Sequence, residues 1–171
     1  MPRHDYTWRS AWSVSRILQA RWPMPDEIPQ SVLERGSRIH EWTENYDTGT
    51  SMVPPAPYEG WCEAYKRFSY TMSPSWTDVE SPVETDQYHG ILDRAGFMRG
   101  KQVVADIKTG PPRESDRLQL AAYALAMYPK RYQSIVRVGV YITKDGEWKI
   151  QTHDKLVDYV DWNTLVREVV G

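Results

Sequence analysis

The order of apolar and polar positions predicts a chain that mixes helices with short strands. Apolar residues recur at helical spacing in the longer segments, and they alternate or run together in the shorter ones. Helices are predicted over residues 31–46, 58–70, 114–128 and 154–169. Strands are predicted over residues 76–83, 87–96, 102–108, 135–143 and 148–152. This order favours an α/β fold in which a mixed sheet of about five strands is flanked by helices.

Local signals set several of these boundaries. Ser31 and Glu34 have the spacing of a capping box, which predicts that a helix begins with Ser31 as its N-cap. Pro129 ends the helix over 114–128, whose apolar face is rich in Leu and Ala. The Val- and Ile-rich run that follows it is typical of a buried strand reached by a crossover helix.

The first 30 residues form an N-terminal extension in which aromatic and basic residues alternate. A proline-rich linker closes this extension, with prolines at 23, 25 and 29. Tryptophans beside arginines can stack bases and contact phosphates of a single-stranded nucleic acid. The alternative, which we favour for most of the tryptophans, is a short amphipathic helix that packs on the core. The residues concerned are Trp8, Trp12 and Trp22, with Arg3, Arg9, Arg16 and Arg21.

Two carboxylates and one lysine lie on the β-hairpin predicted over 87–108. Side chains alternate along a strand, so Asp106 and Lys108 share one face, and the apolar residues between them face the core. Asp93 lies on the preceding strand. Converging carboxylates suit Mg²⁺ or Mn²⁺, and a nearby lysine can orient water or stabilise charge on phosphorus. These are the parts of metal-assisted phosphodiester hydrolysis. An Asp–Lys pair on a solvated hairpin is the alternative.

Composition limits the class of protein. With 171 residues, 40% hydrophobic and 26% charged, the chain fits one globular domain over residues 1–171. It has no apolar run long enough to span a membrane and no signal-like start, so we expect a cytoplasmic protein with no membrane partner. The single cysteine, Cys62, excludes an internal disulfide and an iron–sulfur cluster held by four cysteines of one chain.

The net charge of −2 hides a segregated distribution. Residues 26–93 carry thirteen acidic and four basic groups, whereas residues 94–137 carry nine basic and three acidic groups. A basic segment next to an acidic centre fits a polyanion brought to a metal site. Folding can equally scatter these charges over the surface, and the sequence leaves both interpretations open.

Four motifs in order resemble the RecB-type branch of the PD-(D/E)xK nuclease superfamily. This branch includes the mitochondrial genome-maintenance exonuclease, phage exonucleases and the iron–sulfur nucleases of CRISPR adaptation. The resemblance covers residues 31–140 and implies a restriction-endonuclease-like core. Its motifs are Arg-Ile-His-Glu at 38–41, Gly-Ile-Leu-Asp at 90–93, Asp-Ile-Lys-Thr-Gly at 106–110 and Gln-Leu-Ala-Ala-Tyr-Ala at 119–124.

The resemblance assigns a role to each matching residue. It implies that His40, Asp93, Asp106 and the backbone carbonyl of Ile107 bind Mg²⁺ or Mn²⁺. By itself a lone helical histidine such as His40 is more often structural. Lys108 would be the catalytic lysine, and the acid Glu80 corresponds more loosely to an accessory acid. Gln119 and Tyr123 match the helix that supports the site and touches the scissile strand.

These assignments lead to one principal hypothesis for function. It is a metal-dependent DNA exonuclease that prefers single strands or ends. We expect it to act in recombination, repair or replication, in a bacterial or phage-infected cell. It would act alone or with a recombination or replication protein. The alternatives are a structure-specific endonuclease with the same site and a catalytically silent DNA-binding protein. Expected DNA contacts are Trp8, Arg9, Trp12, Arg94, Arg113 and Arg117.

Overall fold

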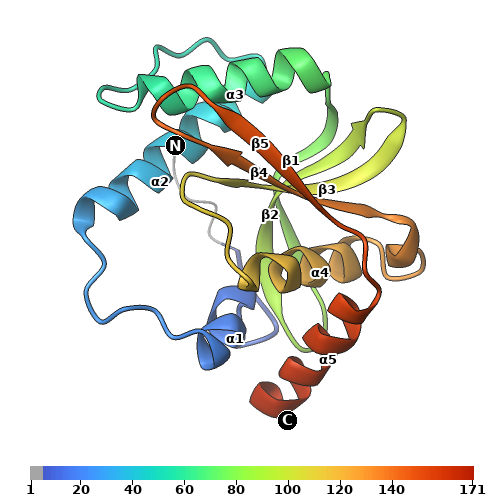
Figure 1. Ribbon diagram of the computed structural model, residues 1–171. Coiled ribbons are helices and arrows are strands. Elements are labelled where there is room, and N and C mark those ends of the chain that lie inside the picture. The colour runs from blue at the N-terminus through green and yellow to red at the C-terminus, as the bar shows by residue number, and fades with distance from the viewer. Residues whose placement is uncertain (1–5) are drawn as a thin grey trace.

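The computed structural model describes residues 6–171, so the first five residues of the predicted extension, Arg3 among them, lie outside the described part. From residue 30 onward, its α-helices and strands follow the predicted order of two helices, three strands, a helix, two strands and a helix (Figure 1). The α-helices are α1 (Val14–Arg21), α2 (Gln30–Asp47), α3 (Glu59–Met72), α4 (Ser115–Met127) and α5 (Val157–Val170), with a short 3-10 helix, η1 (Tyr132–Ser134). The strands are β1 (Ser75–Glu84), β2 (His89–Met98), β3 (Lys101–Lys108), β4 (Val136–Ile142) and β5 (Trp148–His153).

The five strands form one mixed sheet in the order β1-β2-β3-β4-β5. β1, β2 and β3 are antiparallel neighbours, and β4 and β5 form a second antiparallel pair. β3 and β4 are parallel, with Lys108 beside Tyr141 in the register. The connection between parallel neighbours passes through α4, as a crossover must. The predicted α/β fold with a restriction-endonuclease-like core is confirmed.

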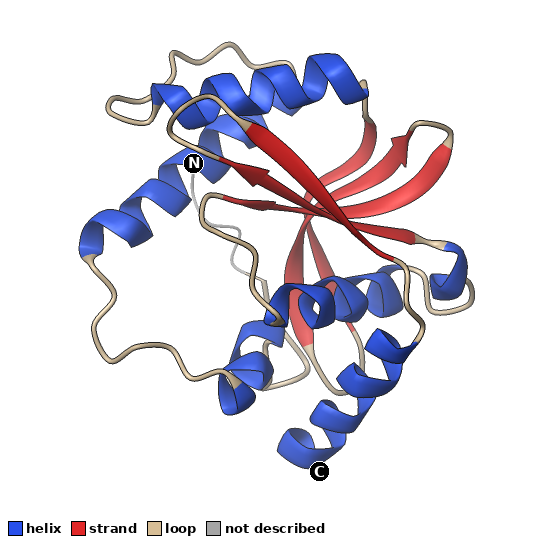
Figure 2. Ribbon diagram, viewed as in Figure 1, coloured by secondary structure: helices blue, strands red, loops and turns tan. Residues whose placement is uncertain are grey.

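Helices cover both faces of the sheet (Figure 2). On one face, α2 and α3 pack on Val103, Ala105 and Ile107 of β3 through residues such as Trp42 and Phe68. On the other face, α1, α4 and α5 form a second core that includes Val104. The alternation in β3 therefore divides its apolar side chains between two cores, and it leaves Asp106 and Lys108 on the α4 side.

Two predicted helix starts differ from the structure. α2 begins at Gln30 after Pro29 and has no side-chain cap, so the prediction of Ser31 as N-cap is wrong. Pro29 occupies the N-cap position with an extended ψ of 131°, and its carbonyl accepts hydrogen bonds from the Val32 and Leu33 amides. The last helix begins at Val157, three residues later than predicted.

The N-terminal segment packs on the domain. Ser13 caps α1 by accepting a hydrogen bond from the Arg16 amide, and α1 buries Val14, Ile17 and Leu18. Trp12 and Trp22 pack against the core that α1, α4 and α5 share. This confirms the packing interpretation for these two tryptophans. No helix among residues 6–171 has the length and apolar character needed to cross a bilayer.

Candidate active site

The β2–β3 hairpin brings Asp93 and Asp106 together. Arg94 of β2 pairs with Ala105 of β3. One residue farther from the hairpin turn on each strand, Asp93 and Asp106 are therefore neighbours. The Asp93 Oδ2 accepts a hydrogen bond from the Ile107 amide at 2.8 Å, which fixes the carboxylate across the hairpin. Both aspartates are buried. A pair of buried carboxylates on one face needs a positive charge between or beside them.

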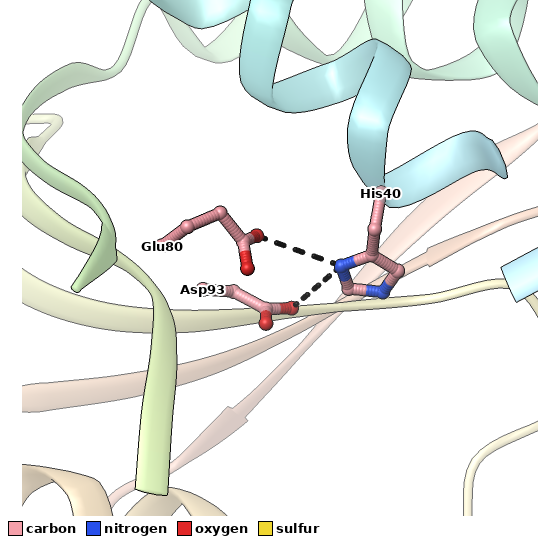
Figure 3. Close-up of side chains that lie close together, drawn as sticks. All are labelled: His40, Glu80 and Asp93. Carbon is pink, nitrogen blue, oxygen red and sulfur yellow. Dashed lines mark ion pairs between the residues drawn. The ribbon is translucent and has the colours of Figure 1, made fainter. Parts of the chain in front are cut away.

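His40 approaches this pair from α2 (Figure 3). Its Nδ1 lies 3.7 Å from Asp93 Oδ2 and 3.6 Å from Glu80 Oε1, and its Nε2 lies 3.0 Å from the Ile107 carbonyl oxygen. Burial alone would lower the pKa of His40, but the carboxylates of Asp93, Glu80 and Asp106 outweigh it and raise the pKa to about 9. The imidazole is therefore in a strongly anionic environment.

Glu80 reaches the site through a strained backbone. Val79 pairs with Arg94 and Ser81 with Leu92, so Glu80 stands across from Asp93 on β1. Its φ is +47°, a left-handed conformation that a non-glycine residue adopts at a cost of roughly 1–3 kcal/mol. One ligand atom from each of His40, Glu80 and Asp93 lies within 4.8 Å of the others. Glu80, the looser match in the sequence, is thus as close to His40 as Asp93 is.

Arg94 is a structural residue, and the prediction that it contacts DNA is wrong. Its side chain is 0% exposed, because it points to the face of β2 opposite Asp93. The guanidinium donates to Asp47 Oδ2 at 2.6 Å, to Glu80 Oε1 at 3.0 Å and to Thr43 Oγ1 at 3.1 Å. Arg94 therefore ties α2 and β1 to β2 and holds Glu80 at the site.

Lys108 extends from the end of β3 to a second group of polar side chains. Its Nζ lies 2.6 Å from Asp106 Oδ2 and donates to Gln119 Oε1 at 2.6 Å. Burial raises the pKa of Asp106 to about 6, against the opposite effect of Lys108. Burial lowers the pKa of Lys108, but Asp106 and Asp116 outweigh it, so the pKa lies above its usual value. The predicted catalytic lysine is thus paired with the predicted metal-binding aspartate.

Asp116 belongs to this group, although sequence reasoning missed it. It lies in the first turn of α4, is buried, and places Oδ1 3.7 Å from Lys108 Nζ. Its Oδ2 accepts hydrogen bonds from the Tyr141 hydroxyl at 2.7 Å and from the Arg113 amide at 2.9 Å. Gly139 makes room for the Tyr141 ring, since a Cβ there would approach the ring within 2.7 Å. The feature of the sequence that could have identified Asp116 is its position, an acidic residue three places before Gln119.

Gln119 and Tyr123 lie one turn apart on α4, behind Lys108. The Gln119 Nε2 donates to the Tyr123 hydroxyl at 3.4 Å, while its Oε1 accepts from Lys108. Burial and the nearby carboxylates, Asp106 first, raise the pKa of Tyr123 above its usual range. Tyr123 therefore stays a neutral phenol, and the two residues form a fixed support for the lysine.

A cleft of about 700 Å³ opens over these residues. His40, Asp93, Asp106 and Lys108 line it together with the end of α1 and the loop that follows β3. Arg113 is exposed at its rim and is the predicted arginine that faces the cleft. Arg117 does not line it: Asp158, Asp161 and Glu114 lie within 3.5 Å of its guanidinium. The prediction of Arg117 as a DNA contact is therefore not supported.

The other three predicted DNA contacts lie on the N-terminal segment. Trp8 stacks on His89 with ring centroids 4.4 Å apart, and the Arg16 guanidinium covers the Trp12 ring. Arg9 is exposed and pairs with Glu84, whose Oε1 accepts its backbone amide. Both tryptophans therefore use part of their surface in contacts within the protein. Trp8 also lines a small cavity together with Tyr123.

The donor set fits a divalent cation. Carboxylate and carbonyl oxygens with one imidazole suit Mn²⁺ or Mg²⁺. The Oδ2 of Asp106 is buried, and apart from the ionic contact with Lys108 no donor reaches it with hydrogen-bond geometry. A cation beside Asp93, Glu80 and Asp106 would offset the mutual repulsion of these carboxylates, as the Lys108 ammonium already does for Asp106.

Comparison with known proteins gives a likeness of fold. No protein-family model matches the chain, and no curated protein matches it in sequence. A provisionally assigned exonuclease from Eubacterium rectale superposes with a TM-score of 0.54 at 13% identity, covering 90% of this chain and 70% of that one. An alkaline exonuclease from Laribacter hongkongensis gives a TM-score of 0.47 at 15% identity, covering 91% and 84%.

Proposed function

We propose that this protein is a Mg²⁺- or Mn²⁺-dependent deoxyribonuclease, an exonuclease of the RecB-type PD-(D/E)xK branch. It acts on single-stranded DNA or DNA ends in recombination, repair or replication, as a single domain in the cytoplasm. The observation that carries the proposal is the convergence of Asp93, Asp106 and Lys108 with His40 and Glu80 at one end of the sheet. The likeness of fold to an exonuclease supports it.

The acidic side of the site is assigned to metal binding. His40, Glu80 and Asp93 would hold the ion through atoms that lie within 4.8 Å of one another. The resemblance adds Asp106 and the Ile107 carbonyl as further ligands, and that carbonyl contacts His40 Nε2, whereas His40 Nδ1 faces Glu80 and Asp93. A bound ion supplies Lewis-acid polarisation of the phosphate and a more acidic water. The four side chains come from α2, β1, β2 and β3, so the packing of these elements fixes the position of the ion.

The chain's own groups supply the rest. Lys108 would orient the attacking water or stabilise negative charge on the phosphate through its Nζ. Gln119 and Asp116 hold the lysine in place from α4. The exposed guanidinium of Arg113 is placed to contact a phosphate outside the reacting one.

An assay with linear and circular substrates tests this proposal. Purified protein is incubated with Mg²⁺ or Mn²⁺ and with end-labelled single-stranded, duplex and circular DNA. The proposal predicts that linear single strands are degraded from an end and that single-stranded circles stay intact. Cleavage of circles would replace the exonuclease with an endonuclease. No hydrolysis of any substrate with either metal would contradict the proposal.

A further inference from the structure

A second pocket of about 490 Å³ lies beside the cleft and plays no part in the chemistry assigned above. Its walls come from α3, the ends of β4 and β5, and the loop after β3. Two partly buried tryptophans, Trp61 and Trp148, line it with Tyr141. We call this the tryptophan pocket. Its volume is in the range of pockets that bind small aromatic ligands.

The tryptophan rings are held in place by the protein. The indole of Trp148 packs edge-to-face on the buried Phe68, with centroids 5.7 Å apart. The indole of Trp61 lies edge-to-face against Tyr58 and donates to the Thr109 carbonyl at 3.4 Å. The β4–β5 turn lies against α3 (Figure 1), so closely that a Cβ at Gly60 would clash with the Lys144 carbonyl. The pocket is therefore preformed, and a ligand would not need to order it.

The tryptophan pocket and the catalytic cleft share one wall. Thr109, Gly110 and Pro111, which directly follow Lys108, line both. Arg35 lines the cleft, donates to Thr109 Oγ1 at 3.4 Å and places its guanidinium 5.3 Å from the Trp61 ring centroid. The two compartments are therefore adjacent, with Arg35 at their junction.

The chemistry of the two compartments differs. The cleft carries carboxylates and a lysine beside apolar residues of α1 and the segment after it, whereas the walls of the tryptophan pocket are mainly apolar and aromatic. Its rim carries Lys144 and Lys149 but also Asp145 and Glu147, so it does not attract an anion as such. A ligand suited to both compartments has a phosphate linked to a flat, uncharged ring, and a nucleotide unit of DNA has this form.

We propose that the tryptophan pocket holds an unpaired nucleobase of the strand whose phosphate lies at Lys108. The proposal rests on the proposed function and deepens it, because it gives a physical source of single-strand preference. A base in a duplex is covered by its neighbours, so only an unpaired base can enter. Stacking is tolerant of base identity, since each base has a π-face, so the pocket selects unpaired DNA with little sequence preference.

Abasic scanning of the wild-type protein tests this directly. A short single-stranded oligodeoxynucleotide is made with one abasic unit at successive positions, and its affinity is measured with Ca²⁺ in place of Mg²⁺. We expect one position, or two adjacent ones, to weaken binding about tenfold, the loss that one stacked base implies. An equal affinity at every position overturns the proposal.

The variant Trp148→Leu supplies the second arm, and Tyr70→Leu is the matched control, since Tyr70 is an aromatic residue on α3 that is 88% exposed. We expect Trp148→Leu to bind intact DNA about tenfold more weakly and to lose nothing further at the sensitive abasic position. The control should behave as wild type. If the loss of affinity from Trp148→Leu and the loss from the abasic unit multiply, the proposal is overturned. If Trp148→Leu does not fold, the wild-type scan decides alone.

Failure of this inference is distinguishable from failure of the proposed function. A protein that cleaves DNA with Mg²⁺ but gives a flat abasic scan keeps the nuclease assignment and loses only the base-holding pocket. A wild-type protein that neither binds nor cleaves DNA overturns both.

Discussion

Lys108 depends on the residues around it for its position. A free lysine side chain has many rotamers, and each must be excluded for Nζ to stay at the site. Asp106 and Gln119 each lie 2.6 Å from Nζ, and Asp116 lies 3.7 Å away on a third side. Tyr141 fixes Asp116 through its hydroxyl. We therefore regard Asp116 as a positioning residue for the lysine.

The variant Asp116→Asn should lower kcat for DNA cleavage by about 10- to 100-fold, the usual effect of losing a group that orients a reacting one. KM should change little, because Asp116 is buried and its Oδ2 is already held by the Tyr141 hydroxyl and the Arg113 amide. Steady-state kinetics with Mn²⁺ measure this split, and Asp161→Asn, on α5, is the matched control. A rise in KM at unchanged kcat would mean that Asp116 acts in DNA binding.

Arg94 should contribute to the free energy of unfolding and should not contact DNA directly. The variant Arg94→Met removes the cation beside the buried Asp47, which keeps only the hydrogen bond from the Tyr65 hydroxyl, and this loss costs about 3–5 kcal/mol. Thermal unfolding should show a large fall in Tm, whereas Arg113→Met, at an exposed arginine, should leave Tm nearly unchanged. An Arg94→Met protein as stable as wild type would contradict the structural role.

The main site residues could be predicted from the sequence, and the others could not, for physical reasons. Strand alternation alone places Asp106 and Lys108 on one face, and a hairpin register places Asp93 beside them. The same alternation turns Arg94 away, but a basic residue next to an acidic centre resembles a phosphate contact in sequence. The approach of Asp116 to Lys108 depends on how α4 packs on the sheet, and no local pattern encodes that.

At the scale of elements, periodicity predicted every strand and all the helices from α2 onward. The predicted helix boundaries were less accurate where a possible N-cap residue follows a proline, as Ser31 follows Pro29 at the start of α2. The tryptophan pocket was not predicted, because Trp61 and Trp148 belong to elements about 90 residues apart. Their meeting requires the β4–β5 turn to dock on α3.

β5 makes a pH-dependent contribution to stability. His153, opposite Arg137 at the end of β5, is partly buried, and burial lowers its pKa. Asp158 and Asp116 act in the opposite direction, while Arg137 and Arg117 lower the pKa further. A folded-state pKa below the unfolded one means that protonation opposes folding. Stability should therefore fall as the pH drops through about 6.5, the ordinary pKa of histidine.

The variant His153→Asn tests this contribution. The fall in Tm between pH 7.5 and 5 should be smaller in the variant than in wild type, since asparagine does not titrate in that range. Circular dichroism melts at a series of pH values give the comparison. An identical pH dependence in both proteins would show that His153 is not the responsible group.

For the whole molecule, four elements meet at the metal-binding group, so binding of an ion should stabilise the domain. At 100 times its Kd, a ligand adds about 2.7 kcal/mol to the free energy of unfolding. We expect Mn²⁺ to raise the Tm of wild type but not of an Asp93→Ala/Asp106→Ala double variant. An equal rise in both would place the ion elsewhere on the protein.

The central claim is that Asp93 and Asp106 form a metal centre that hydrolyses DNA. Its most direct test is the hydrolysis of an end-labelled single-stranded oligonucleotide by wild type and by Asp106→Asn, each with Mn²⁺ and with EDTA. We predict that only the wild-type protein with Mn²⁺ releases short products. Equal hydrolysis by both proteins, or hydrolysis by wild type in EDTA, would contradict the account.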